Sequence, residues 1–389
     1  MCFWILTMRK PYRVIVWGPG SIGRACLREL ARRKEFEVAG VLGFSSHKVG
    51  LDAGELIGRK PMGIKVTADK EAIFAMDADC VLWTGTFPST DELANEMEED
   101  VLRLLKSGKN VVTPAAFHYI HSQSPEYIKK FEDACREGNT CFHGTGENPG
   151  FWLERVALTL TGVCNDVDHI KLDEYADCAL GGMSTEILNA IGFGMPENQA
   201  AEIANVLGVT WSRHHFVESI NFASKSLYGQ HVDRFEFTPR FYLAEEDIIL
   251  DTGKGDGINM VIPAGCVKAM THRFQGFVGN DKLLSITVNW FLMPRTSPFG
   301  DKKDSTWDIE IEGKPTSLKC SFSAMASFKN NLERYPGDPT SPTWYATITP
   351  LIQAIPIVCS HEPGIVYASV FASSAPDLRM LETRKSLVD

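Results

Sequence analysis

Three glycines near the start of the chain have the spacing that could hold a pyrophosphate. Gly18, Gly20 and Gly23 form a G-x-G-x-x-G pattern directly after the apolar run YRVIVW. In such a unit the first glycine allows a tight turn, the second lets phosphate approach the backbone, and the third lets helix and strand pack closely. A helix beginning with Ser21 and Ile22 would present its N–H groups to the same phosphate. These residues predict a dinucleotide site in a βαβ unit.

The residues after the second predicted strand bear on which dinucleotide binds. That strand ends VLGFSSHK, without the acid that normally binds the ribose 2′-OH of NAD. Ser45, Ser46, His47 and Lys48 offer hydroxyl donors and a cation that suit a 2′-phosphate. The same residues could also form an ordinary polar loop. We expect NADP(H) to be preferred, with NAD(H) as the alternative cofactor.

Three further polar or glycine-rich segments follow later predicted strands. They read WTGTFP, TPAAFH and HGTGENPG. Ligands of open parallel sheets bind beyond the carboxyl ends of the strands, so these segments are expected beside the ribose and the nicotinamide. The residues expected to contact the cofactor there are Thr84, Gly85, Thr86, Pro114, Ala115 and Asn148.

The candidate catalytic residues are Glu147, His118 and Tyr175. Glu147 could steady a substrate ammonium or iminium by its charge, or it could be an acid at a helix N-terminus. His118 could donate a proton, or it could be a histidine in a surface loop. Tyr175 ends the first strand of the second domain and could face the cleft. A cationic iminium accepts hydride without a general acid, whereas a ketone needs a proton donor.

Two patterns of elements would position these residues. The first alternates strands with helices, which predicts a doubly wound parallel sheet and an α/β fold class. After Gly150 a helix, a strand, a helical stretch and long strands predict a second, α+β domain on a large mixed or antiparallel sheet. The expected strands are 12–18, 36–44, 64–67, 78–86, 110–115, 139–144, 166–176, 235–250, 259–277, 282–292 and 307–323, and the expected helices are 21–33, 69–76, 89–108, 125–137, 151–161 and 343–358.

The domain bounds follow from this change of pattern. A dinucleotide-binding Rossmann domain is expected over residues 1–147 and a substrate-binding and dimerisation domain over 148–342. A C-terminal helix within 343–389 is expected to pack back on the first domain.

Composition excludes several classes of function. The chain has 389 residues and a formal net charge of -10, which argues against nucleic-acid binding. No apolar stretch approaches the length of a transmembrane helix. The ten cysteines form no C-x-x-C pair or metal-ligand cluster, which favours reduced thiols in a cytoplasmic protein without a metal.

Two longer motifs resemble a known family. His47–Gly58 (HKVGLDAGELIG) and Gly144–Val156 (GTGENPGFWLERV) are similar to segments of dihydrodipicolinate reductase-like oxidoreductases, a group that includes 2,4-diaminopentanoate dehydrogenase and native amine dehydrogenases. The resemblance implies a Rossmann domain followed by a domain whose open sheet builds a homodimer. It also implies hydride transfer between NAD(P)H and a C=N bond of a small molecule.

The chain departs from that family at two places. It lacks the E-x-H-H-x-x-K-x-D-x-P-S-G-T block of true dihydrodipicolinate reductases. Where native amine dehydrogenases place a glutamate after the fifth strand, this chain has Ala115 and Ala116. Three functions therefore stay open: an oxidoreductase acting on a preformed imine or an amine, a carbonyl reductase with His118 or Tyr175 as donor, and a catalytically silent NADP(H)-binding sensor or scaffold.

Overall fold

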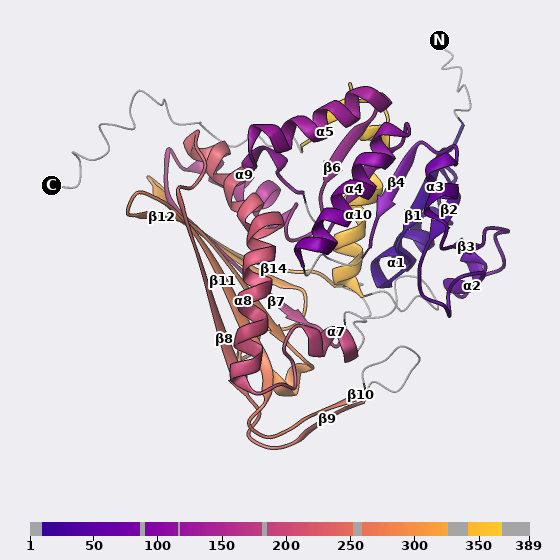
Figure 1. Cartoon of the computed structure of the whole chain (residues 1–389). Helices are drawn as coiled ribbons and strands as arrows, with labels where there is room; N and C mark the ends of the chain where they lie inside the picture. The colour runs from indigo at the N-terminus through magenta and orange to yellow at the C-terminus, as the bar shows by residue number, and fades with distance from the viewer. Residues whose placement is uncertain are drawn as a thin grey trace, which may run out of the picture.

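The computed structural model describes residues 10–85, 90–115, 117–180, 185–251, 259–325 and 341–367. Within these residues the chain builds a parallel sheet with helices on both faces and a second, mixed sheet beside it (Figure 1). The predicted α/β fold class, with a doubly wound first sheet and a second domain on a mixed sheet, is confirmed.

The first sheet has the strand order β15-β6-β5-β4-β1-β2-β3, and every pair of neighbours is parallel. Its central strands are short and rich in buried β-branched residues, as expected of a sheet covered on both faces. The strands are β1 (Tyr12–Trp17), β2 (Phe36–Leu42), β3 (Val66–Thr67), β4 (Cys80–Trp83), β5 (Asn110–Thr113), β6 (Cys141–Gly144) and β15 (Gly364–Ile365).

Alternate residues of the central strands feed two hydrophobic layers, because successive side chains of a strand point to opposite faces. On one face Val14 packs under α1 and α10, and on the other Ile15 packs under α3, α4 and α5. The helices are α1 (Ser21–Leu30), α2 (Ala53–Leu56), α3 (Lys70–Ala75), α4 (Asp91–Lys106), α5 (Pro125–Gly138) and α10 (Pro342–Val358).

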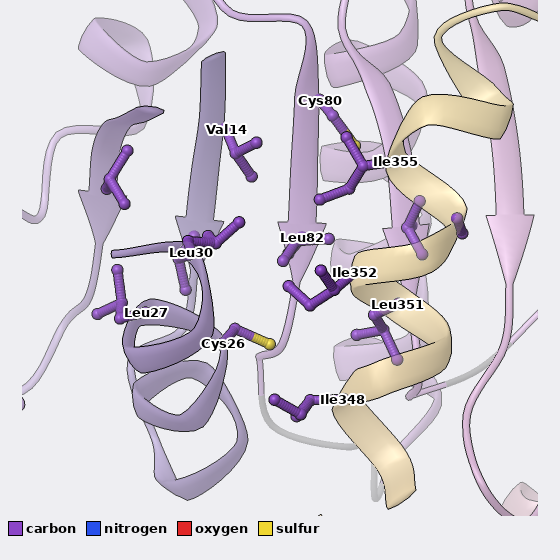
Figure 2. Packing of buried hydrophobic residues seen from close by; sticks show 14 of the residues in the cluster. Val14, Cys26, Leu27, Leu30, Cys80, Leu82, Ile348, Leu351, Ile352 and Ile355 are labelled. Atoms are coloured by element: carbon purple, nitrogen blue, oxygen red, sulfur yellow. The ribbon is translucent and has the colours of Figure 1, made fainter. Parts of the chain in front are cut away.

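The helix α10 comes from the far end of the chain and fills the space beside α1. Figure 2 shows Ile348, Leu351 and Ile352 of α10 meeting Leu82 of β4 and Cys26 of α1. After α10 the chain adds β15 to the edge of the same sheet, next to β6. This helix ends at Val358, so the C-terminal helix within 343–389 is shorter than that range, and residues 368–389 lie outside the described residues.

The second sheet has the order β14-β13-β7-β12-β11-β8, in which only β7 and β12 are parallel neighbours among the described strands. Its apolar face packs on α9 and on a short π-helical turn that follows the first domain. The elements of this part are the π-helical turn (Trp152–Ala157), α6 (Leu158–Leu160), β7 (Asp166–Asp177), α7 (Thr185–Ala190), α8 (Glu197–His214), α9 (Phe216–Tyr228), β8 (Arg234–Leu243), β9 (Ile248–Asp251), β10 (Asn259–Ile262), β11 (Val267–Val278), β12 (Asp281–Phe291), β13 (Thr306–Lys314) and β14 (Leu318–Ser323).

Three of the long strands expected from the sequence are each divided in two. The range 235–250 holds β8 and β9, 259–277 holds β10 and β11, and 307–323 holds β13 and β14. Pro263 and Pro315 lie at two of the breaks, and proline has no N–H to donate to a ladder. The predicted domain bounds, 1–147 and 148–342, stay a prediction.

Candidate active site

The three glycines form a tight turn, and at two of its positions, Gly18 and Gly23, only glycine fits. Gly18 has φ +93°, and a Cβ there would lie 2.7 Å from the backbone of Gly85. A Cβ on Gly23 would press on the carbonyl of Gly18 and lie 2.8 Å from Oγ1 of Thr84. At Gly20 a Cβ would meet no atom within 4 Å. The turn is therefore packed closely beneath Gly18 and Gly23 and open above Gly20, as a site for a pyrophosphate requires.

Helix α1 begins on this open side. Gly20 is its N-cap, and no side chain caps the helix there. Ser21 and Ile22 follow in the first turn, whose N–H groups and dipole favour an anion. Thr84, at the end of β4, donates its hydroxyl to the carbonyls of Trp17 and Gly18 at 3.1 and 2.8 Å and so fixes the turn from below.

The loop after β2 lies beside the same turn. Lys48 donates from Nζ to the carbonyl of Pro19 at 3.3 Å, which joins the predicted 2′-phosphate loop to the glycine turn. The hydroxyl of Ser45 lies 2.8 Å from Nδ1 of His47. Ser46 is exposed next to them. Asp52 is the N-cap of α2, and its carboxylate accepts a hydrogen bond from the backbone N–H of Gly54 at 2.7 Å.

The loops after β4, β5 and β6 meet at one edge of the sheet. A Cβ on Gly146 would contact Pro114, so the loop after β6 lies against the loop after β5. Ala115 is buried and donates its N–H to the hydroxyl of Thr113 at 3.1 Å. Gly85 lies over the ring of Trp83. Thr86 and Ala116 lie outside the described residues.

Glu147 and Asn148 stand in the loop that crosses from the first domain to the second. The side chain of Glu147 is 7 % exposed, and Nε1 of Trp152 donates to its Oε1 at 3.1 Å. Asn148 donates from Nδ2 to Oε2 of Glu174 on β7 at 2.7 Å. Nε1 of Trp307 donates to the same oxygen at 3.2 Å.

Glu147, in the crossover loop, and Glu174, on β7, are neighbouring buried acids, and Asn148 beside Glu147 donates to the carboxyl of Glu174. Burial raises the pKa of Glu147 well above its usual range, and the negative charge of Glu174 raises it further. Burial also raises the pKa of Glu174. Neither carboxyl takes part in an ion pair with another described residue. The rings of Trp152 and Trp307 stack at 4.4 Å beside them.

His118 follows β5 and lies against His215, which precedes α9. It is only 6 % exposed, so the interpretation as a surface loop histidine is wrong. Neither ring nitrogen has a hydrogen-bond partner among the described residues. Burial, helped by the nearby His143, lowers the pKa of His118 to about 3. The ring is therefore neutral at physiological pH, and its edge lies against His215 at the start of α9.

Tyr175 lies on the opposite face of the second sheet from Glu174, because neighbours in a strand alternate. Its ring lies 5.8 Å from that of Phe299, and Nζ of Lys302 lies 5.3 Å from its centroid. The structure therefore does not bring Tyr175 together with Glu147. The residue that sequence reasoning missed is Glu174, and the alternation of β7 was the signal that could have found it.

Comparison with known proteins supports the resemblance seen in the motifs. Residues 12–99 match the family model described as dihydrodipicolinate reductase, N-terminus. An amine dehydrogenase of Streptomyces virginiae is 30% identical over 186 residues, 47% of this chain and 51% of that protein. A 2,4-diaminopentanoate dehydrogenase of Acetoanaerobium sticklandii is 26% identical over 163 residues, 41% of this chain and 44% of that protein.

These matches confirm the resemblance to dihydrodipicolinate reductase-like oxidoreductases. The matched segments span about half the length of the two curated relatives. The fold extends further: the structure of an amine dehydrogenase from Mycobacterium smegmatis superposes with a TM-score of 0.66 at 20% identity, covering 91% of this chain and 94% of that one.

The described residues include neither a metal-binding cluster nor a membrane-spanning helix. No group of three or more His, Cys, Asp or Glu side chains in the described part of the chain is arranged to hold a metal ion. No helix there is both long and apolar enough to span a membrane.

Proposed function

We propose that this protein is an NAD(P)H-dependent oxidoreductase that acts on the C=N bond of an imine or iminium, or on the corresponding amine. The observation that carries the proposal is the buried Glu147–Glu174 pair at the edge of the sheet where the loops after β4, β5 and β6 meet. Two acids without a cationic partner suit a substrate nitrogen that carries positive charge.

The glycine turn supports the cofactor part of the proposal. Open space above Gly20 and close packing below Gly18 and Gly23 fit a dinucleotide, whose nicotinamide supplies or accepts a hydride when bound. We propose that Lys48, with Ser45, Ser46 and His47, binds a 2′-phosphate and makes NADP(H) the preferred cofactor. Pro114, Ala115, Thr84, Gly85 and Asn148 are proposed to line the nicotinamide half.

The names of the relatives agree with this chemistry. Two curated relatives are dehydrogenases named for amines, one an amine dehydrogenase and the other a 2,4-diaminopentanoate dehydrogenase. The resemblance also supports a homodimer. The nine described cysteines are free thiols, which suits a reducing, cytoplasmic setting.

A carbonyl reductase on the same scaffold would need a proton donor at the substrate oxygen. Tyr175 faces away from the crossover loop, and the lowered pKa of His118 keeps its ring neutral at physiological pH. The site therefore favours a substrate whose nitrogen already bears the charge.

The test is oxidation of NADPH and NADH, followed by absorbance, with cyclic imines, and with ketones in the presence and absence of ammonia. Reduction of cyclic imines without ammonia, together with oxidation of amines in reverse, is the expected result. Turnover of ketones alone would support the carbonyl reductase, and tight NADPH binding without any turnover would support a sensor.

A further inference from the structure

Hydrogen-bond acceptors remain in excess around the crossover loop after the protein's own donors are counted. Trp152 and Trp307 donate to the carboxyl of Glu147. Asn148, Trp307 and Trp290 donate to that of Glu174. These few N–H groups leave carboxyl lone pairs unfilled. The amide oxygen of Asn148 is itself buried and has no hydrogen-bond partner among the described residues. A group rich in N–H donors, such as an alkylammonium ion, would satisfy this excess.

Oxidation of an amine requires a free lone pair on its nitrogen, and an alkylammonium ion has none. Hydride can leave the carbon only as the lone pair of the nitrogen forms the C=N bond. An alkylamine at neutral pH is mostly an ammonium ion, whose lone pair is occupied by a proton. That proton must therefore be removed before the hydride departs, and the site must supply a base.

We propose that Glu147, coupled to Glu174, is the general base that deprotonates an alkylammonium substrate, which makes simple primary or secondary amines the substrate class. This inference rests on the proposed function and goes beyond it. The N–H bond breaks, its electron pair stays on nitrogen, and the proton adds to a carboxylate oxygen of Glu147. An oxidised nicotinamide, when bound, would accept the hydride with the electron pair of the C–H bond, and the nitrogen lone pair would then form the C=N bond of an iminium product.

The surroundings of Glu147 suit this role. Glu147 lies near Glu174 and near Asp304. Two buried carboxyls can hold one proton between them, which leaves one carboxylate ionised, and the positive charge of a bound ammonium favours the ionised form of Glu147. Burial and the charge of Glu174 raise the pKa of Glu147, which makes it a stronger base than an exposed glutamate. The hydrogen bond from Trp152 fixes one oxygen of the carboxylate. No described lysine or arginine neutralises the pair.

The experiment compares amines of different basicity in the full-length protein with its oxidised cofactor. One substrate is a strongly basic alkylamine, and the other is a fluorinated analogue that is largely neutral at the assay pH. Glu147→Gln should lower kcat/KM for the basic amine by about 100-fold or more, since it removes the base. The fluorinated amine needs no base, so its rate should change far less. The defect with the basic amine should also shrink as the pH rises toward the pKa of that amine.

A matched control is Glu154→Gln, which makes the same change at another buried glutamate, bonded to the hydroxyl of Ser219. It should leave the ratio of the two amines unchanged. Cofactor binding, followed by NADPH fluorescence, establishes that each variant is folded, and Glu174→Gln provides a second variant of the pair. An equal loss for both amines in Glu147→Gln would overturn the inference while leaving the proposed function in place. Turnover of imines without turnover of any amine would overturn the inference, and absence of turnover of both imines and amines by the wild type would overturn the proposed function itself.

Discussion

The carboxylate of Glu218 on α9 accepts a 3.1 Å hydrogen bond from the backbone N–H of Tyr119, in the loop that follows β5. The side-chain amide of Gln123 donates to its other oxygen at 3.2 Å. Glu218 is fully buried, and burial raises its pKa from 4.5 to about 7. One acid of the second domain therefore holds the loop that carries His118.

The burial of Glu218 predicts a pH dependence of stability, because burial outweighs the hydrogen bonds that lower its pKa. Because the pKa of Glu218 is higher in the folded than in the unfolded chain, its contribution is fully present below about pH 4.5 and is lost as the pH rises through about 7. The loss is on the order of 3 kcal/mol at most. Between pH 5 and pH 8 the melting temperature of the wild type should fall more than that of Glu218→Gln. Glu202→Gln, at an exposed position of α8, is the control, and parallel curves for wild type and Glu218→Gln would contradict the prediction.

Substitutions in the glycine turn should separate folding from cofactor binding. Gly20→Val places a side chain in open space, so we expect a wild-type melting temperature and a loss of NADPH binding. Gly23→Ala instead presses on the carbonyl of Gly18 and should lower stability by about 1–3 kcal/mol. Thermal unfolding and NADPH fluorescence measure the two effects. Undiminished NADPH binding by Gly20→Val would show that the cofactor does not lie over this turn.

The loop after β2 should determine cofactor preference. Lys48 lies within hydrogen-bond distance of the glycine turn, and a charged hydrogen bond to a 2′-phosphate would be lost in Lys48→Ala. We expect the dissociation constant of NADPH to rise about tenfold and that of NADH to change little. Lys60→Ala, at an exposed position beyond α2, is the control. An equal change for both cofactors would assign Lys48 to the turn rather than to the phosphate.

Tyr175 should be dispensable for turnover. Its ring packs on Phe299, on the face of the second sheet that does not carry Glu174. Tyr175→Phe keeps that contact and removes only the hydroxyl, so kcat and its pH profile should match those of the wild type. A strong loss of kcat with ketones but not with amines would contradict this prediction and support the carbonyl reductase function.

Local rules were enough to predict much of the first sheet. The spacing of Gly18, Gly20 and Gly23 identifies a turn whose geometry needs no information from elsewhere in the chain, and the apolar runs after it mark β2, β4 and β5. Strand β15 could not be predicted because two residues, Gly364 and Ile365, carry no periodic signal. Their pairing with β6 depends on α10 bringing them there.

The candidate site was predicted less well, for a similar reason. Glu147 lies within the GTGENPG motif, so its sequence position was enough to make it a candidate. Its partner Glu174 is one of several polar residues in β7, and only the register with β13, which sets Trp307 opposite it, shows which face it occupies. The burial of His118 also depends on contacts with α9, which begins almost a hundred residues later in the chain.

The return of α10 and β15 to the first sheet has a consequence for the order of folding during synthesis. Ile348, Leu351 and Ile355 complete a hydrophobic layer whose members on β1 and α1 leave the ribosome more than three hundred residues earlier. Until then the face of β1 and β4 beside α1 is exposed to water. The first sheet begins the chain and yet is completed by its last described helix, so we expect a nascent chain halted before α10 to expose an apolar surface of the kind that chaperones bind.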